Sequence, residues 1–328
     1  MKIKELLNST GSERQALHET ARALRDQCFG RTVFVRGVVE VSNYCRQNCH
    51  YCAMRRDNHV LERYRLNLDP LLELLLHHRP ASITDIDIQA GEDPIVVRDV
   101  VIPLVRELRR QTNLGITLCL GLLPNEMYDA LREAGADYYV LKLETGDAIH
   151  YQTIAAPGTF AQRIAAIHYL ASRGWKVSSG LIVGLPGQDA DMIATSLRLL
   201  EELPLAGCSV SPFVAGEDTP YADHLNGNVE TALNCVALMR QSRPDWFIPA
   251  VSAMQLLAPD GYVRAIQAGA NLTTINLTPR WQREHYPIYK HQRLIMDEDR
   301  VLTAIDRAGC TPSPVGVSEF LRNRSVVA

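Results

Sequence analysis

Three cysteines stand close together near the start of the chain: Cys45, Cys49 and Cys52, with the spacing C-x3-C-x2-C. Thiolates packed this closely on a short loop can hold three irons of a [4Fe–4S] cube. The fourth iron is then left without a protein ligand, and an open coordination position is where a metal site reacts, as in catalytic zinc sites. The spacing therefore predicts one cluster that takes a further ligand, with the aromatic Tyr51 directly before the last cysteine.

Clustered cysteines also occur in zinc sites and in disulfide frameworks. A structural zinc site usually joins one ligand pair to a second, and the chain has no second C-x2-C pair and no H-x3-H pair. Eight cysteines in 328 residues are too few for a disulfide framework, and the short charged start, Met1–Leu7, does not look like a signal peptide. We therefore expect a cytoplasmic protein and an iron–sulfur cluster, with zinc as the alternative.

Composition narrows the class of partner. The formal net charge is −3, and no basic stripe or long run of like charge indicates a nucleic-acid or membrane surface. No apolar run approaches the roughly 20 residues that a membrane-spanning helix needs. The apolar fraction of 46% is ample for a hydrophobic core. These properties give no support for a nucleic-acid or a membrane partner.

Apolar runs alternate with amphipathic segments along the chain, which predicts parallel strands joined by helices. Eight such strands predict a complete (β/α)8 barrel, with an open doubly wound sheet as the alternative. We expect a helical extension over residues 1–30, the barrel over residues 31–310 and a tail over residues 311–328. The predicted strands are Val33–Val41, Ile83–Ala90, Gly115–Gly121, Tyr138–Glu144, Lys176–Gly184, Cys208–Val214, Phe247–Val251 and Leu272–Leu277; the main predicted helices are Val97–Arg110, Asn125–Ala134, Phe160–Ser172, Asp189–Leu203, Val229–Gln241 and Gly261–Ala268.

Barrel enzymes carry their active sites at the carboxyl ends of the strands, which is where the cysteines follow the first predicted strand. Gly91 and Glu92 follow the second. A glycine lets a ligand approach the backbone, and a carboxylate accepts hydrogen bonds from an ammonium group. A plain acidic turn is the alternative interpretation.

The fourth and fifth strands offer further polar groups. Strand alternation puts Lys142 and Glu144 on one face, where the carboxylate suits a pair of hydroxyl groups or forms an ion pair with the lysine. Arg163 opens the next helix and presents a planar fork for a carboxylate, unless it is simply solvated. Glycines on the fifth strand indicate close backbone approach there, either by the edge of a base at Leu181 and Ile182 or by a packed helix.

These motifs resemble the radical S-adenosylmethionine (SAM) superfamily, in its biotin-synthase-like branch. The resemblance is greatest to the [FeFe]-hydrogenase maturases and the methylornithine synthases of that branch, and it runs from about Val33 to Tyr289. One departure is Ala90, which stands where the family's Gly-Gly-Glu motif has its first glycine. The matching segments are Tyr44–Asn58, Gln89–Asp93, Leu143–Thr145, Gly184–Gly187, Ser211–Phe213, Asp218–Pro220, Gly269–Asn271 and Asn276–Pro279.

The resemblance implies specific roles. The cysteines would bind one [4Fe–4S] cluster whose open iron is chelated by SAM, and reductive cleavage of SAM would give a 5′-deoxyadenosyl radical. That radical would take hydrogen from a small amino-acid- or thiol-derived substrate, for rearrangement, fragmentation or cofactor maturation. A reductant such as flavodoxin or ferredoxin is implied, with room for a partner protein. Tyr51 would pack beside the adenine, Gly91, Glu92, Glu144 and Arg163 would contact SAM, and the backbone of Leu181 and Ile182 would face the adenine.

Two other functions stay open. Sulfur insertion of the biotin or lipoyl type needs a second cluster, yet Cys119 is alone on the third strand and Ser178 stands at the expected position on the fifth. An iron–sulfur or zinc scaffold without SAM chemistry would have no need of the candidate SAM contacts. Asn276, Thr278 and Arg280 after the last strand, with Tyr221, His224 and Tyr286, are candidates for lining a substrate site.

Overall fold

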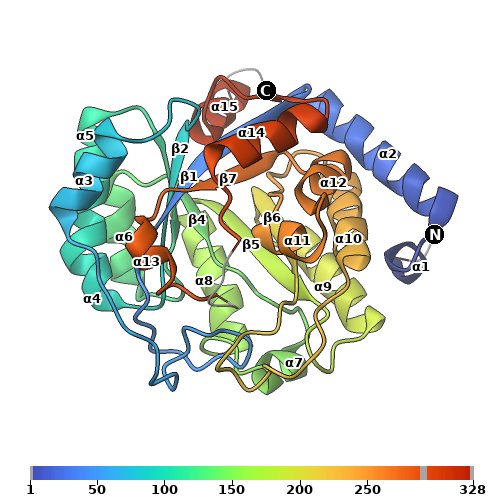
Figure 1. Cartoon of the computed structure of the whole chain (residues 1–328), viewed down its shortest axis with the longest axis horizontal. Coiled ribbons are helices and arrows are strands. Elements are labelled where there is room, and N and C mark those ends of the chain that lie inside the picture. The colour runs from blue at the N-terminus through green and yellow to red at the C-terminus, as the bar shows by residue number, and fades with distance from the viewer. Residues whose placement is uncertain (1–2, 289–293, 326–328) are drawn as a thin grey trace.

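The structure is a computed structural model that describes residues 3–288 and 294–325. Tyr289, where the family resemblance ends, and residues 326–328 of the predicted tail lie outside these ranges. One curved parallel sheet has the strand order β6-β5-β4-β3-β2-β1-β7, and helices cover its outer face (Figure 1). The strands are β1 (Thr32–Ser42), β2 (Asp85–Ala90), β3 (Gly115–Cys119), β4 (Tyr138–Val140), β5 (Lys176–Val183), β6 (Gly207–Pro212) and β7 (Leu272–Asn276).

Helices follow most of the strands, as the alternation of sequence patterns predicts. Two of them, α6 and α8, have the bounds that were expected from their amphipathic pattern. The helices are α1 (Ile3–Leu7), α2 (Gly11–Phe29), α3 (Leu68–His77), α4 (Pro94–Val96), a π-helical segment (Val97–Val101), α5 (Ile102–Gln111), α6 (Asn125–Ala134), α7 (Ala148–Thr153), α8 (Phe160–Ser172), α9 (Ala190–Glu202), α10 (Val229–Ser242), α11 (Ser252–Leu257), α12 (Gly261–Gln267), α13 (Arg280–Arg283), α14 (Glu298–Arg307) and α15 (Val317–Ser325).

Strand β1 pairs in parallel with β2 on one side and with β7 on the other. Nine of its eleven residues are buried, the exceptions being Thr32 and Arg36. Parallel strands are generally covered on both faces, and burial along most of β1 agrees with this. The cysteine segment leaves the carboxyl end of this strand.

The sheet does not show the complete eight-stranded barrel that was predicted. The expected strand at Phe247–Val251 is reduced to two isolated bridges, Gly207 with Phe247 and Pro249 with Leu272, which lie between β6 and β7. Pro249 has no N–H group and cannot donate a ladder hydrogen bond, so a regular strand is interrupted there. The architecture is therefore a seven-stranded parallel half-barrel with a bridged gap.

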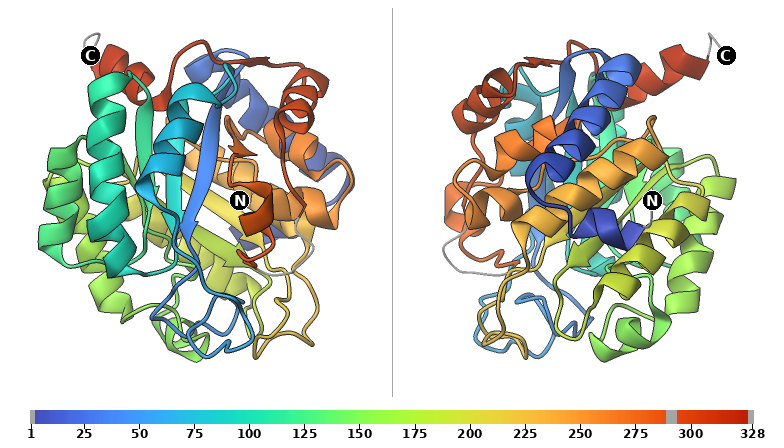
Figure 2. Two further views of the ribbon diagram at one scale, coloured as in Figure 1. Left: turned by 60° about the vertical axis from the view of Figure 1, so that its left-hand side comes forward. Right: turned by 90° about the vertical axis from the view of Figure 1, so that its right-hand side faces the viewer.

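The segments near the two ends of the chain pack against the rest of the fold. Helix α2 lies beside α10 (Figure 2), where Leu17 and Ala21 pack with Ala237. The predicted tail contains a short strand, β8 (Thr311–Pro312), which pairs with β1, and then α15. Both segments are thus parts of the folded body. No helix in the described part of the chain is long and apolar enough to span a membrane.

Candidate active site

The cysteine loop follows β1 and is held in shape by side chains that bond its backbone. Asn43 donates to the carbonyl of Glu62 at 2.7 Å and accepts from the Tyr64 N–H at 2.7 Å. The Arg63 guanidinium donates to four carbonyls of the loop, those of Asn43, Met54, Arg55 and Asn58. A loop without regular secondary structure needs such side-chain donors for its buried carbonyls. The loop gathers with α7 and residues 213–228 at one end of the sheet (Figure 2).

The three cysteines of this loop are free thiols that lie close to one another. Cys49 is buried, and Cys45 and Cys52 are half-buried. Burial raises the pKa of Cys45 and Cys49 and raises that of Cys52 to about 12, and the neighbouring thiols add to the increase at Cys49 and Cys52. A bound metal reverses this effect, because it favours the thiolate form.

The arrangement suits a cluster of several irons. Among the described residues, no three His, Cys, Asp or Glu side chains are placed to hold a single metal ion. A [4Fe–4S] cube sets a different requirement, because each thiolate binds its own iron. The three neighbouring thiols of the cysteine loop supply the donor set for three irons of a cube.

Gly91 and Glu92 lie directly against the cysteine loop. The Gly91 N–H donates to the Ser42 carbonyl at 3.1 Å, and the Glu92 N–H donates to the sulfur of Cys45 at 3.4 Å. The Glu92 carboxylate accepts from the Leu122 N–H at 2.7 Å and from the Gln47 side chain. Glu92 therefore links β2 to the cysteine loop, and its carboxylate is already partly occupied by protein donors.

Replacing Gly91 by alanine should displace the cysteine loop. A Cβ atom at Gly91 would collide with the Tyr44 carbonyl oxygen and would lie 2.8 Å from the Cβ of Cys45. We expect lower iron content after reconstitution, measured against protein concentration. Gly174→Ala is the control for general backbone strain, since its φ of 79° is unfavourable for alanine but its Cβ would meet nothing within 4 Å. Equal iron content in the two variants would contradict the expectation.

Glu144 lies beyond the end of β4, in an isolated bridge with Leu181, and has a strained backbone conformation. Its φ is 65°, a left-handed value that costs energy for a residue other than glycine. Its backbone pairs with β5, donating to the Gly180 carbonyl and accepting from the Ile182 N–H, each at 2.9 Å. The side chain is buried, and its Oε2 has no hydrogen bond but lies 3.8 Å from the Lys142 Nζ. The geometry is compatible with both interpretations of this glutamate: it can form an ion pair with Lys142, and its Oε2 can accept hydrogen bonds from a ligand.

Arg163 is buried, so the alternative of a solvated helix arginine is wrong. Its side chain is 4% exposed, and its Nη1 lies 3.7 Å from the Glu92 Oε1. Neither Nε nor Nη1 makes a hydrogen bond to any residue that the structure describes. Leaving donors of a buried charged group unsatisfied is costly, which indicates that an anionic ligand completes this site. The guanidinium therefore fits the carboxylate of a bound amino acid group.

Tyr51, Leu181 and Ile182 form the apolar side of the site. Tyr51 and Ile182 pack on the same small cluster, which includes Phe213, whereas the Leu181 side chain is in the main core. Both backbone groups of Ile182 are engaged, the N–H with the Glu144 carbonyl and the carbonyl with the Gln188 amide. These residues form an apolar surface beside the cysteine loop. The backbone of Ile182, which was expected to face a base, already has its N–H and carbonyl groups bonded within the protein.

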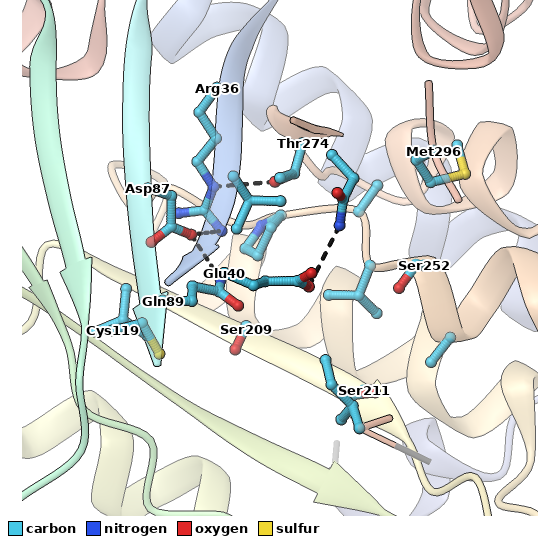
Figure 3. Close-up of a pocket in the computed structure, with 18 of the residues that line it drawn as sticks. Arg36, Glu40, Asp87, Gln89, Cys119, Ser209, Ser211, Ser252, Thr274 and Met296 are labelled. Atoms are coloured by element: carbon cyan, nitrogen blue, oxygen red, sulfur yellow. Dashed lines mark hydrogen bonds and ion pairs between the residues drawn. The ribbon is translucent and has the colours of Figure 1, made fainter. Parts of the chain in front are cut away.

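A cavity of about 220 Å³ lies on the inner side of the sheet (Figure 3). Residues from β1, β2, β3, β4, β6 and β7 line it, together with the bridged segment after Phe247. Lys142 is shared between this cavity and the Glu144 ion pair, so the cavity adjoins the cysteine end of the sheet. Its acidic, basic and amide side chains are Arg36, Glu40, Asp87, Gln89, Lys142 and Asn276.

The sequence did not lead us to expect the cluster of polar side chains on the wall of this cavity. Asp87 accepts from Gln89 at 2.9 Å and lies 3.4 Å from Arg36, whose Nε donates to the Thr274 hydroxyl at 3.0 Å (Figure 3). Glu40 accepts from Asn276 at 3.3 Å. The available signal was alternation: Arg36 and Glu40 on β1, and Asp87 and Gln89 on β2, are polar residues that recur on one face of buried strands.

Some of the other residues that were predicted to line the substrate site line this cavity, and others do not. Asn276 lines the cavity, but the Thr278 hydroxyl is engaged by the Glu40 N–H at 2.9 Å. Tyr221 instead packs against His50 of the cysteine loop, with ring centroids 5.6 Å apart. Cys119 is the one thiol among the described residues that line the cavity. Three further predicted residues do not line it: Arg280 on α13, His224 beside Tyr221, and Tyr286, which packs with Met54 and Leu61.

Comparison with known proteins agrees with this geometry. Residues 39–200 match the model of the radical SAM superfamily. The chain is 34% identical to the [FeFe] hydrogenase maturase subunit HydE of Thermotoga maritima, over 94% of this chain and 86% of that protein. It is 26% identical to the biotin synthase of Rhodopirellula baltica, over 84% of this chain and 79% of that protein.

A solved structure extends the likeness to three dimensions. The crystal structure of methylornithine synthase (PylB) superposes with a TM-score of 0.86 at 25% identity, and the match covers 98% of this chain and 95% of that one. Radical SAM enzymes use a [4Fe–4S] cluster and SAM, and the cysteines that this requires are present. The identity to the hydrogenase maturase over nearly the whole chain, together with the cysteine loop at the carboxyl end of β1, shows that this protein is an enzyme of the radical SAM superfamily.

Proposed function

We propose that this enzyme binds SAM between the cysteine loop and the ends of β4 and β5, and acts on a small amino-acid- or thiol-derived substrate in the adjoining cavity. The observation that carries the proposal is the buried Arg163 guanidinium, whose Nε and Nη1 have no hydrogen bond beside Glu92. A cation held in this way needs an anionic ligand, and the carboxylate of SAM supplies one. Flavodoxin or ferredoxin is the proposed reductant.

Each candidate residue has a defined task in this proposal. Cys45, Cys49 and Cys52 hold the cluster, and Arg163 binds the SAM carboxylate. Glu92, beside Gly91, accepts from the SAM amino group, and the unbonded Oε2 of Glu144 accepts from the ribose hydroxyls. Tyr51 provides an apolar wall for the adenine, beside Leu181 and Ile182. When bound, the cluster supplies one electron that cleaves SAM to methionine and a 5′-deoxyadenosyl radical, which takes hydrogen from the substrate.

The reaction we infer is a rearrangement, a fragmentation or a step in cofactor maturation. Sulfur insertion is less well supported because a second cluster would need several ligands, and Cys119 is the one cysteine among the described residues of the cavity wall. Cys208 and Cys235 are buried in the core, where they act as small apolar side chains. An iron content well above four per chain after reconstitution would favour sulfur insertion instead.

The proposal is tested by SAM cleavage. The anaerobically reconstituted protein, reduced with dithionite and given SAM, should form 5′-deoxyadenosine and methionine in equal amounts, even without substrate. Chromatography of the quenched mixture measures both products, and the unreduced protein is the control. If neither product forms in the reduced sample, the enzyme does not carry out the proposed chemistry.

Glu144→Gln should weaken SAM binding while preserving the cluster. The substitution keeps the side-chain size but removes the charge, and hydrogen bonds to charged groups contribute enough that we expect roughly tenfold weaker binding or more. Equilibrium binding of SAM to the reconstituted protein measures the effect, and visible absorption reports the cluster. Glu133→Gln, on the exposed face of α6, is the control. Unchanged affinity in Glu144→Gln would remove this residue from the SAM site.

A further inference from the structure

Asp87 is a buried carboxylate that faces the cavity with one oxygen unsatisfied. Its exposed fraction is 0%, and its Oδ1 makes no hydrogen bond among the described residues. It comes from the middle of β2, and Figure 3 shows it on the cavity wall beside Arg36 and Gln89. A buried charged group with an open acceptor position is uncommon in a folded protein, because desolvation without a partner costs free energy.

The neighbouring side chains satisfy only the other oxygen. Gln89 donates to Oδ2 at 2.9 Å, and the Arg36 Nη2 lies 3.4 Å from the same atom. Arg36 is held in place by a second bond, from its Nε to the Thr274 hydroxyl. The carboxylate is thus fixed in orientation, while Oδ1 is left to accept from something that enters the cavity.

We propose that Asp87 binds a primary ammonium group at the inner end of the substrate, which makes the substrate class small amines and amino acids. This inference rests on the proposed function, since it assigns the substrate of that same site. An ammonium group is favoured over a hydroxyl because it places an opposite charge beside the buried carboxylate and so stabilises its ionised form, which a neutral hydroxyl donor does not do. Burial raises the pKa of Asp87, and Glu40 adds to the increase, so a cation opposite the carboxylate stabilises its charged form.

The position of Asp87 also orients the substrate. Asp87 precedes Gly91 by four residues, which is about 13 Å along an extended strand. Gln89 and its register partner Cys119 lie between these two levels on β2 and β3. The ammonium end therefore lies deep in the cavity, and the carbon that loses hydrogen lies toward Lys142 and the cysteine loop.

Binding of simple probes tests the assignment without knowledge of the true substrate. The reconstituted protein with SAM is titrated with n-butylammonium chloride, and separately with 1-butanol and sodium butyrate, by calorimetry. We expect the ammonium ion to bind more tightly than the other two compounds. Asp87→Asn should weaken ammonium binding at least about 30-fold, the scale measured when one partner of a buried charge pair is removed. Asp306→Asn, on the exposed face of α14, should leave it unchanged.

The outcomes separate this inference from the proposed function. The visible absorption and iron content of reconstituted Asp87→Asn show whether the variant is folded and carries its cluster, independently of its activity. Equal binding of the alcohol or of butyrate, no ammonium binding at all, or full ammonium binding by Asp87→Asn would each overturn the inference. The comparison of probes on the unmodified enzyme decides the matter even where the variant does not fold. Absence of 5′-deoxyadenosine from the unmodified enzyme would instead defeat the proposed function.

Discussion

Replacing Cys49 by alanine should abolish the visible absorption of the cluster and reduce SAM cleavage to the background rate. Cys49 is the most buried of the three cysteines in the loop, and no other described cysteine is placed to substitute for it there. Two remaining thiolates cannot hold the cube in a form that leaves a single open iron. Absorption spectra and iron content of the reconstituted variant measure the first effect, and 5′-deoxyadenosine formation measures the second.

Cys235→Ala is the matched control, because it removes an equally buried thiol from α10, within the core. This variant should lose some stability through the small cavity that it creates, but it should keep its absorption and its activity. A Cys49→Ala variant with full iron content and full SAM cleavage would show that the cluster is bound elsewhere. A loss of both properties in Cys235→Ala as well would mean that general instability explains the result.

Replacing Arg163 by glutamine should raise the dissociation constant for SAM at least about 30-fold, as expected for removing one member of a buried charge pair. The guanidinium is 4% exposed, and two of its nitrogens have no hydrogen-bond partner among the described residues. Binding the SAM carboxylate satisfies that cation, and glutamine cannot replace the planar charged fork. Equilibrium binding to the reconstituted protein measures the change, and the absorption of the cluster should be retained.

The control is Arg173→Gln at the carboxyl end of α8. This arginine is 53% exposed and pairs with Asp129 at 2.9 Å, so its loss should leave SAM affinity unchanged. Arg163→Lys adds a second comparison, since it keeps the charge but not the fork. Wild-type affinity in Arg163→Gln would mean that the carboxylate of SAM is bound by another group, and the interpretation of the buried nitrogens would be wrong.

Most of the fold was predictable where local signals agree with burial. Helix α8 begins at a capping box formed by Thr159 and Gln162, and α6 ends at Gly135 in a left-handed conformation, so pattern and boundary coincide. The loss of the predicted strand at Phe247–Val251 was hard to foresee, because an apolar run of this kind looks like a strand whether or not a ladder forms. Its proline carried the only warning of the two isolated bridges.

The sequence was enough to predict where the site residues lie, but not how deeply they are buried or which groups they pair with. We expected functional residues to follow the carboxyl ends of the strands. Glu92, Glu144 and Arg163 do lie at the cysteine end of the sheet. Sequence alone could not show that Arg163 is buried, because that depends on how α8 packs against residues far away in the chain. The pairing of Arg36 with Asp87 was equally hidden, since it follows from the register of β1 against β2. The roles of these residues toward SAM stay predictions.

The segment Phe247–Val251 joins β6 to β7 through two isolated bridges only, and we call this segment the seam of the sheet. Elsewhere around the sheet, a change in diameter would have to break a continuous ladder of hydrogen bonds, whereas here isolated bridges hold the edges together. Pro249, Ala250 and Val251 from this seam also line the cavity. Substitutions in the seam can therefore alter the width of the substrate chamber at low cost in sheet stability, while β1 and its cysteine loop stay held by the ladders that β1 forms with β2 and with β7.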